Sequence, residues 1–345
     1  MEYRERPALI SRLDTLVSWF GEVMPGVLTC ITLGMAAAFL SEHYGGPVML
    51  YALLFGMAFN FLSEEGRCLA GVEFSARSIL RFGVALLGVR ITVGEVTELG
   101  PLPVFLVIGA VTSTILVGWG IARILGLSRE QGLLSGGSVA ICGASAAMAL
   151  SAVLPKTADS ERQTILTVVG VTTLSTLAMV IYPALVTLFE LDNFSAGIFL
   201  GGTIHDVAQV VGAGYMVSPE TGDVSTLVKL MRVAMLVPAV FLYSVIYRKA
   251  NAGKGQSKMA LLPGFLLFFI LFVVINSLGI MPVSVVDGLI DLSRWCLVAA
   301  IAALGIKTSF RKLAVVGWLP VVLMVTETVF LCLLVLVVVI FAIPV

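Results

Sequence analysis

The sequence has little charge and almost no histidine. Only 12% of its 345 residues are charged and 2 are histidine, whereas 59% are hydrophobic and the mean hydropathy is +1.07. Because a soluble domain carries about 25% charged residues, this composition excludes a soluble fold. The 21 basic and 21 acidic residues balance, so the basic surplus typical of nucleic-acid binding is also missing.

The motifs of metal sites and of common enzymes are absent as well. The five cysteines form no CxxC pair, and we expect free thiols without disulfides or metal. His43 and His205 are too few for a histidine-rich site, and no HExxH, GxSxG or Walker sequence occurs. We therefore expect no cofactor and no ATP-driven pump. An intramembrane enzyme stays open as an alternative, with Ser138 or Ser145 as nucleophile and His205 as base.

Long uncharged stretches predict an all-α polytopic membrane protein. A membrane-spanning helix needs ~20 apolar residues, and these runs lack the alternation of barrel strands. Residues 1–25 are expected to form a cytoplasmic amphipathic lead-in that ends at the Pro25-Gly26 break, and residues 26–345 one transmembrane transporter domain. We predict 11 spans, near residues 26–41, 46–62, 75–90, 101–125, 131–154, 163–189, 195–216, 224–247, 259–280, 288–306 and 313–343.

The positions of lysine and arginine orient these predicted spans. With a cytoplasmic N-terminus, 14 basic residues lie in inside loops and only 3 lie outside, namely Arg90, Lys156 and Arg162. Excess positive charge marks the cytoplasmic side of a membrane protein. The pattern therefore predicts a cytoplasmic N-terminus and an external C-terminus.

Two internal similarities bear on the architecture. Segments 75–125 and 292–343 match at a spacing of 217 residues, which pairs Gly88 with Gly305. This spacing carries the third predicted span onto the tenth. Because a shift of seven spans is odd, the two copies cross the membrane in opposite directions, as in many secondary transporters. A shorter match pairs 136–139 with 201–204. Either one of these segments is re-entrant or the match is chance.

Glycine and serine are dense in the fifth predicted span. Because each interior glycine costs a helix ~1 kcal/mol relative to alanine, we expect a broken helix whose free N–H groups face a bound anion. Close packing of helices through small residues, with serines bonded to their own helix, is the alternative. The candidate anion ligands here are Gly137, Ser138, Gly143 and Ser145.

Ionisable residues lie within the next spans, where they indicate function. His205, Asp206 and Gln209 share the seventh span, and Lys229 and Arg232 share one face of the eighth. The two cations would complement a small oxyanion, His205 and Asp206 would set or relay protonation, and Gln209 would orient them. A purely structural His–Asp cluster, or an Arg232–Asp206 pair with Lys229 at the headgroups, stays open.

Two further polar residues in the predicted spans have expected roles. Glu327, in the last span, is another buried charge. With Asp206 as a second carrier it would serve a cation/proton antiporter, which we keep as a competing function. Asn60 is expected to cap a helix end.

These motifs resemble those of the bacterial YeiH-type family of inner-membrane proteins, described as sulfate exporters. The resemblance rests on residues 82–88, 136–146, 202–214 and 228–232 and covers roughly residues 20–343. It implies a multi-pass secondary transporter of the bacterial cytoplasmic (inner) membrane, with sulfate or a related oxyanion such as sulfite as cargo. A proton or sodium ion as coupling ion, and a homodimer in the lipid bilayer, are open expectations.

Overall fold

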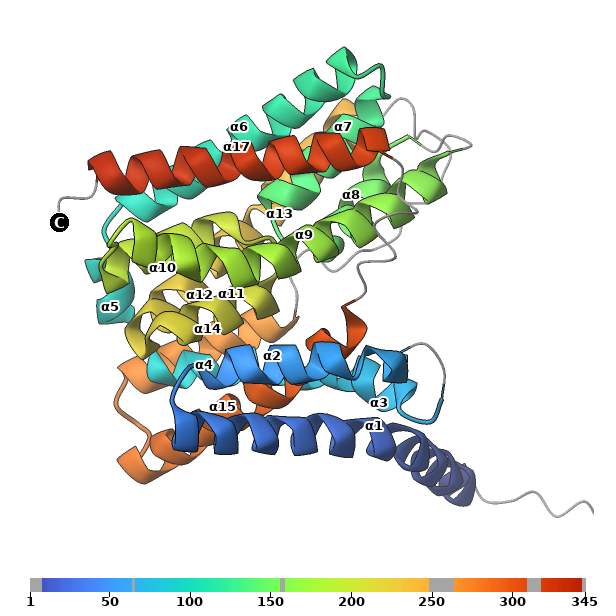
Figure 1. The fold of residues 1–345 in the computed structure, drawn as a ribbon, viewed down its shortest axis with the longest axis vertical. Helices are drawn as coiled ribbons and strands as arrows, with labels where there is room; N and C mark the ends of the chain where they lie inside the picture. Colours follow the sequence, from blue (N-terminus) through green and yellow to red (C-terminus); the bar gives the residue numbers. More distant parts are fainter. Residues whose placement is uncertain (1–7, 64–65, 156–158, 248–263, 309–317, 343–345) are drawn as a thin grey trace, which may run out of the picture. The chain divides into compact units, whose positions relative to one another are not determined.

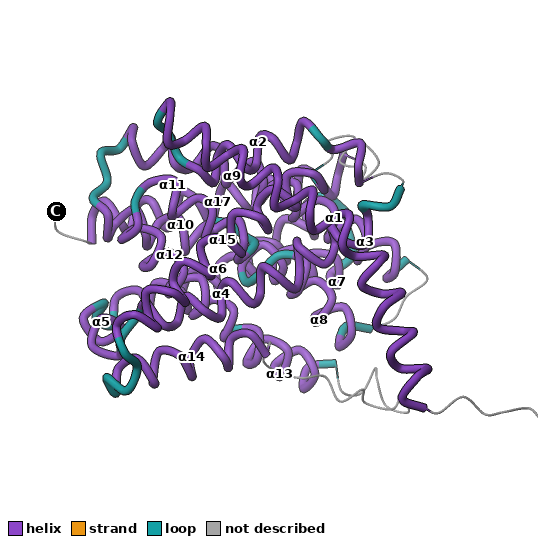
Figure 2. Tube along the Cα trace, turned by 90° about the horizontal axis from the view of Figure 1, so that it is seen from below, coloured by secondary structure: helices purple, strands orange, loops and turns teal. Residues whose placement is uncertain are grey.

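A computed structural model describes residues 8–63, 66–155, 159–247, 264–308 and 318–342 (Figure 1). Within these ranges the chain is helical and contains no strand (Figure 2). Two compact units are present, one formed by Met1–Val84 with Asp291–Thr308 and the other by Ala85–Ile290 with Ser309–Val345. Whether they act as one transporter domain stays a prediction.

The first unit is built on the long helix α1 (Ala8–Tyr44), which packs against α2 (Val48–Ala58) and α3 (Leu69–Phe74). The expected helix break at Pro25-Gly26 is not found, because α1 continues through both residues. A β-carbon on Gly26 would collide with the backbone at Gly71 of α3. The glycine therefore serves close helix packing rather than a helix end.

The remainder of this unit comprises short segments and the end of a long helix. Asn60 caps a helix end, as expected, although the helix is distant in sequence: its amide donates to Ile306 O at 2.7 Å and Thr308 O at 2.9 Å. The elements are η1 (Asn60–Ser63), η2 (Ser75–Ile79), the beginning of α4 (Leu80–Leu87) and the end of α15 (Val283–Lys307).

The second unit contains the other described helices, and all the candidate site residues lie in it. In chain order these are η3 (Gly88–Arg90), α5 (Val93–Glu98), α6 (Leu102–Ile124), α7 (Arg129–Ala140), α8 (Ala144–Val153), α9 (Ser160–Leu188), α10 (Asn193–Thr203), α11 (Val207–Val217), α12 (Pro219–Ala234), α13 (Leu236–Ile246), α14 (Gly264–Ser277) and α17 (Trp318–Ala342).

Helices α10 and α11 form a hairpin, here called hairpin 2. At its open end the start of α10 lies beside the end of α11, because the Ser218 hydroxyl donates to the Asn193 side-chain oxygen at 3.0 Å. Each arm has 11 residues, about 16 Å at ~1.5 Å per residue, whereas a bilayer core is ~30 Å thick. The seventh predicted span is therefore a hairpin that adds no crossing.

Helices α7 and α8 form a second such structure, hairpin 1. A β-carbon on Gly137 of α7 would collide with the Leu150 side chain of α8, so the two arms lie against each other. The start of α7 also lies beside the start of α9, which follows α8, because Gln163 donates to the Ser128 hydroxyl at 3.4 Å. The fifth predicted span is thus folded back on itself as well.

Two longer helical segments run beside the hairpins. Helix α9 begins next to the open end of hairpin 1 and ends where α10 begins. The α12–α13 segment begins at the open end of hairpin 2 and finishes near hairpin 1, where Tyr243 donates to Leu133 O at 3.3 Å. In Figure 1 the hairpins accordingly lie toward opposite ends of these segments.

The structure does not confirm the expected number of 11 spans. Among the described residues, 6 helices are long and apolar enough to cross a membrane, beginning at Ser18, Leu102, Ser160, Pro219, Val283 and Trp318. The helix break expected in the glycine-rich fifth span is present, and the seventh span is interrupted as well. Their form, two folded-back hairpins, lowers the number of crossings.

Candidate functional site

The tips of the two hairpins meet at Lys229 and Arg232 of α12. The Lys229 ammonium donates to Ile141 O of hairpin 1 at 2.7 Å, and to Ile204 O at 3.0 Å and His205 O at 2.5 Å of hairpin 2. A β-carbon on Gly143 would lie 3.7 Å from His205 O, so the tips are in contact. Lysine has three donors, and all of them are used here.

Arg232 joins the same two tips one helical turn further along α12. Its guanidinium donates to Val139 O and Ala140 O at 2.9 Å each, and to Gly201 O at 3.1 Å and Ile204 O at 3.0 Å. Both cations are fully buried, with 0% exposure.

The ends of two interrupted helices, α7 and α10, explain why Lys229 and Arg232 lie at the hairpin tips. The last carbonyls of a helix have no partner within it and carry the negative end of the helix dipole. Helices α7 and α10 both end at the tips, so their unpaired carbonyls need donors in a place that water does not reach. Lys229 and Arg232 supply those donors, and the carbonyls in turn stabilise two buried positive charges.

Helix α8, which begins after the interruption in hairpin 1, has a glycine at its N-cap and so no capping side chain from that residue. Helices α7, α10, α11 and α12 each begin with a side chain that accepts a backbone N–H, whereas α8 begins at Gly143 without one. Gly143 has a φ of 63°, a conformation that glycine adopts without strain. Gly143 therefore supplies no cap to the first N–H groups of α8 at the tip of hairpin 1, and the Cys142 sulfur lies beside one of them, that of Ala146. A helix start with a glycine at its N-cap suits an anion.

His205 and Gln209, at the tip of hairpin 2, each keep one buried atom without a hydrogen-bond partner. The Thr328 hydroxyl donates to Met324 O, so it accepts from Nε2 of His205 at 3.0 Å. Gln209 donates to Thr176 at 2.8 Å. Nδ1 of His205 and Oε1 of Gln209 remain unpaired, and orphaned buried polar atoms of this kind call for a functional explanation.

Asp206 begins α11 as its N-cap. Its carboxylate accepts the Ala208 N–H at 2.9 Å, and its own N–H donates to the Ser175 hydroxyl at 2.9 Å. Together with Lys229 and Arg232, it leaves the tip region with one net positive charge when His205 is neutral.

The serines and glycines of hairpin 1 divide between packing and the tip. Ser138 is buried and donates to Leu134 O at 2.5 Å, the self-bonding that was one of the two expectations. Ser145 is exposed in the first turn of α8. Gly137 contacts the opposite arm of the hairpin, and Gly143 makes the turn. Among the described contacts of Ser138, Ser145 and His205, no serine–histidine hydrogen bond is formed.

The residues of α9 and α17 that support the tips were not among the residues predicted from the sequence. Ser175 and Thr176 of α9, and Thr328 of α17, hold Asp206, Gln209 and His205, respectively. Serine and threonine in apolar helices usually bond to their own backbone. Nothing in the sequence pattern distinguishes these three from such residues, so only the structure identifies them.

These features define a multi-pass helical membrane protein with two opposed hairpins, and comparisons with known sequences support the membrane-protein class. The model of a family described as "Conserved hypothetical protein 698" matches residues 25–324. A UPF0324 membrane protein of Chlorobaculum tepidum is 56% identical over 92% of this chain and 89% of its own length. The UPF0324 membrane protein TauZ of Paracoccus pantotrophus is 51% identical over 90% of this chain and 93% of its own.

The chain therefore belongs to the UPF0324 family of membrane proteins, which matches the YeiH-type resemblance found in the sequence. A further member, from Rhizobium meliloti, is 51% identical over 92% of both chains.

Proposed function

We propose that this protein is a secondary transporter of the bacterial cytoplasmic membrane that carries a small oxyanion, sulfate or sulfite, by alternating access. The observation that carries the proposal is the meeting of two opposed hairpin tips on Lys229 and Arg232. Irregular backbone at membrane depth is tolerated beside protein or a wet cavity, and broken helices that meet halfway are typical of the substrate sites of transporters.

Three features near the tips support an anion as cargo. The N-cap of α8 is a glycine, which has no side chain to cap the helix, the region carries net positive charge, and Nδ1 of His205 is unpaired. Because Nε2 of His205 donates to Thr328, Nδ1 of the neutral ring is an acceptor, and an oxyanion would bind there only together with a proton that turns Nδ1 into a donor. Since the donors of Lys229 are all used by carbonyls, the two cations act on the anion through their charge and by holding the tips.

Alternating access would follow from movement of one hairpin tip relative to the other. Each tip is held by hydrogen bonds to α12, and α9 supports hairpin 2 through Ser175 and Thr176. Exchanging some of these bonds would open the site to either side in turn. The orientation with a cytoplasmic N-terminus, and a homodimer as the assembly, belong to this proposal as well.

Flux of labelled sulfate and of labelled sulfite into proteoliposomes tests the function. An oxyanion accepts hydrogen bonds, so the group of Gln209 that can hold it is the amide N–H that is not bonded to Thr176; Gln209→Met removes this N–H while Thr176 keeps its bond to Thr172 O at 3.0 Å. Losing one hydrogen bond of about 1.4 kcal/mol to the ligand is expected to lower uptake about tenfold at limiting substrate. The matched control is Gln163→Met, at the start of α9, which should transport like the wild type.

Two results would contradict the proposal. One is the absence of flux for both anions in the wild-type protein. The other is equal flux in Gln209→Met and wild type, which would remove the site from the pathway.

A further inference from the structure

Glu327 of α17 is a fully buried carboxyl group at 0% exposure, on the hairpin 1 side of the site. Its Oε2 accepts the Ser135 hydroxyl of α7 at 2.5 Å, whereas its Oε1 has no hydrogen-bond partner. A β-carbon on Gly118 of α6 would collide with Oε1. The carboxyl group is therefore enclosed by three helices and only half satisfied.

No cation balances this carboxyl group among the residues that the structure describes, whose salt bridges all lie elsewhere. An isolated carboxylate in a low-dielectric interior is very costly and must be neutralised. Thr114 of α6, one turn before Gly118, also holds a buried hydroxyl without a partner. The tight contact with Gly118 favours a proton over a metal ion, because a proton needs no coordination shell.

Neighbouring residues of α17 connect this carboxyl group with the tip of hairpin 2. Glu327 is bonded to Ser135 of hairpin 1, and Thr328, the next residue, is bonded to His205 of hairpin 2. A change at Glu327 therefore acts on the same helix backbone that positions His205.

We propose that Glu327 is the coupling-proton site of this carrier, so that an oxyanion and a proton cross together. The inference rests on the proposed oxyanion transport. With Glu327 ionised, the two carboxylates balance Lys229 and Arg232, whereas protonation restores a net positive charge beside the tips. Anion binding then favours proton uptake, and by reciprocity proton uptake favours anion binding.

Other titratable groups lie near Glu327 or against α17, and the test must separate them from Glu327. His205 contacts it through Thr328. Tyr182 of α9 lies beside Cys332 of α17. Tyr243 of α13 donates to Leu133 O of α7.

Glu327→Gln imitates the protonated carboxyl group and provides the test. In proteoliposomes an inside-alkaline pH gradient should raise wild-type accumulation of labelled sulfate or sulfite about tenfold. The variant should lose this stimulation and keep sulfate–sulfate or sulfite–sulfite exchange. The matched control, Glu190→Gln, changes an exposed carboxyl group at the end of α9 and should behave like the wild type.

An infrared readout without substrate separates this inference from the proposed function. A carbonyl-stretch band of a protonated carboxyl group should titrate with pH in the wild type and in Glu190→Gln, and should be missing in Glu327→Gln. If the band titrates as expected while neither anion is transported, the proton site stands and the oxyanion function fails.

Three results would overturn the proton site. The first is a titrating band that survives in Glu327→Gln. The second is the absence of any such titration in the wild type. The third is accumulation in Glu327→Gln that still follows the pH gradient, or wild-type accumulation driven by a sodium gradient instead.

Discussion

At the scale of single residues, Lys229 and Arg232 hold the broken ends of two helices. The sequence predicts both as deep cations, with anions or carboxylates as their partners. The hydrogen bonds instead go to backbone carbonyls of both hairpins. A sequence shows which side chains are charged, whereas carbonyls become available only where a helix ends.

Removing the guanidinium of Arg232 should destabilise the protein strongly. Arg232→Met leaves carbonyls of α7 and α10 buried without donors, and since each unsatisfied acceptor costs about 1–3 kcal/mol, we expect a loss of at least about 3 kcal/mol in the free energy of unfolding. The stability of Arg232→Lys should lie between those of Arg232→Met and the wild type, because lysine keeps the charge but cannot reproduce the planar fork of hydrogen-bond donors. Thermal unfolding in detergent measures both.

Arg162→Met, at the exposed start of α9, is the control for this prediction and should unfold like the wild type. If Arg232→Met were as stable as this control, the bridging role of Arg232 would be disproved.

At the scale of elements, glycines fit α6 against α7. Gly118 of α6 lies against Gly132 and Gly136 of α7, where a β-carbon would be 3.0 Å from Gly132 O. These glycines represent the close-packing alternative considered for the fifth span. Gly143 represents the broken-helix alternative, since it makes the turn of hairpin 1. The two expectations therefore both hold, each for different glycines of one segment.

Substituting alanine at two glycines of α6 should have opposite effects. Gly118→Ala would place a methyl group against Glu327 and α7, so we expect destabilisation by about 1–3 kcal/mol. Gly109→Ala meets no atom within 4 Å and should stabilise the helix by up to about 1 kcal/mol. The unfolding temperatures of the two purified variants, compared with that of the wild type, give the sign of each change in stability. A stabilising Gly118→Ala would show that α6 and α7 pack less closely.

At the scale of the molecule, the structure gives the shorter internal similarity a physical meaning. Ser138 donates to Leu134 O and Thr203 to Phe199 O, both at 2.5 Å and both one turn before a tip. The residue pairs are related by the same spacing of 65. If both matched segments crossed the membrane, the copies would run parallel. Both segments are hairpins that return to the side on which they start. Each copy therefore crosses the membrane only through the long segment that follows its hairpin, which is α9 in the first copy and α12–α13 in the second, and the two copies run in opposite directions.

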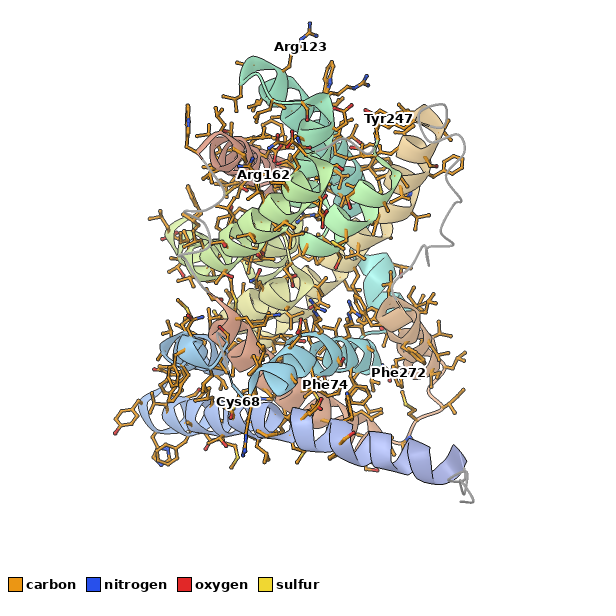
Figure 3. The ribbon with its side chains drawn as sticks, turned by 90° about the vertical axis from the view of Figure 1, so that its right-hand side faces the viewer. Cys68, Phe74, Arg123, Arg162, Tyr247 and Phe272 are labelled. Carbon is orange, nitrogen blue, oxygen red and sulfur yellow. The ribbon has the colours of Figure 1, made fainter. Side chains whose placement is uncertain are left out.

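This arrangement changes the expected side of one loop. Arg123 ends α6 and points away from the bundle (Figure 3), and Arg162 lies in the first turn of α9. Since hairpin 1 returns to the side from which it starts, both residues lie on the same side of the second unit. The prediction from 11 spans placed them on opposite sides. Lys156, in the same loop as Arg162, lies outside the described residues.

Labelling of single cysteines tests this topology. In a background without the native cysteines, Arg123→Cys and Arg162→Cys should react with a membrane-impermeant maleimide only in inverted vesicles, because the basic loops are expected in the cytoplasm. Glu190→Cys, at the far end of α9, should react only in intact cells. Labelling of Arg123→Cys and Arg162→Cys from opposite sides would show that hairpin 1 crosses the membrane.

The similarity at 217 residues agrees with the helix bounds of the second unit. Helix α6 (Leu102–Ile124) shifted by this spacing falls on α17 (Trp318–Ala342) to within one residue at each end, and these helices pack together. The duplication itself stays a prediction.

The sequence by itself determined the all-helical membrane class, favoured a break in the glycine-rich fifth span and located the deep polar residues. These follow from local properties, namely the length of apolar runs, the glycine content and the cost of burying charge. Only the tertiary structure decided that the interrupted segments fold back, since an apolar run of a given length has the same hydropathy whether straight or bent. It also decided the partners of Lys229, Arg232 and Glu327, because those contacts join segments between 24 and 192 residues apart.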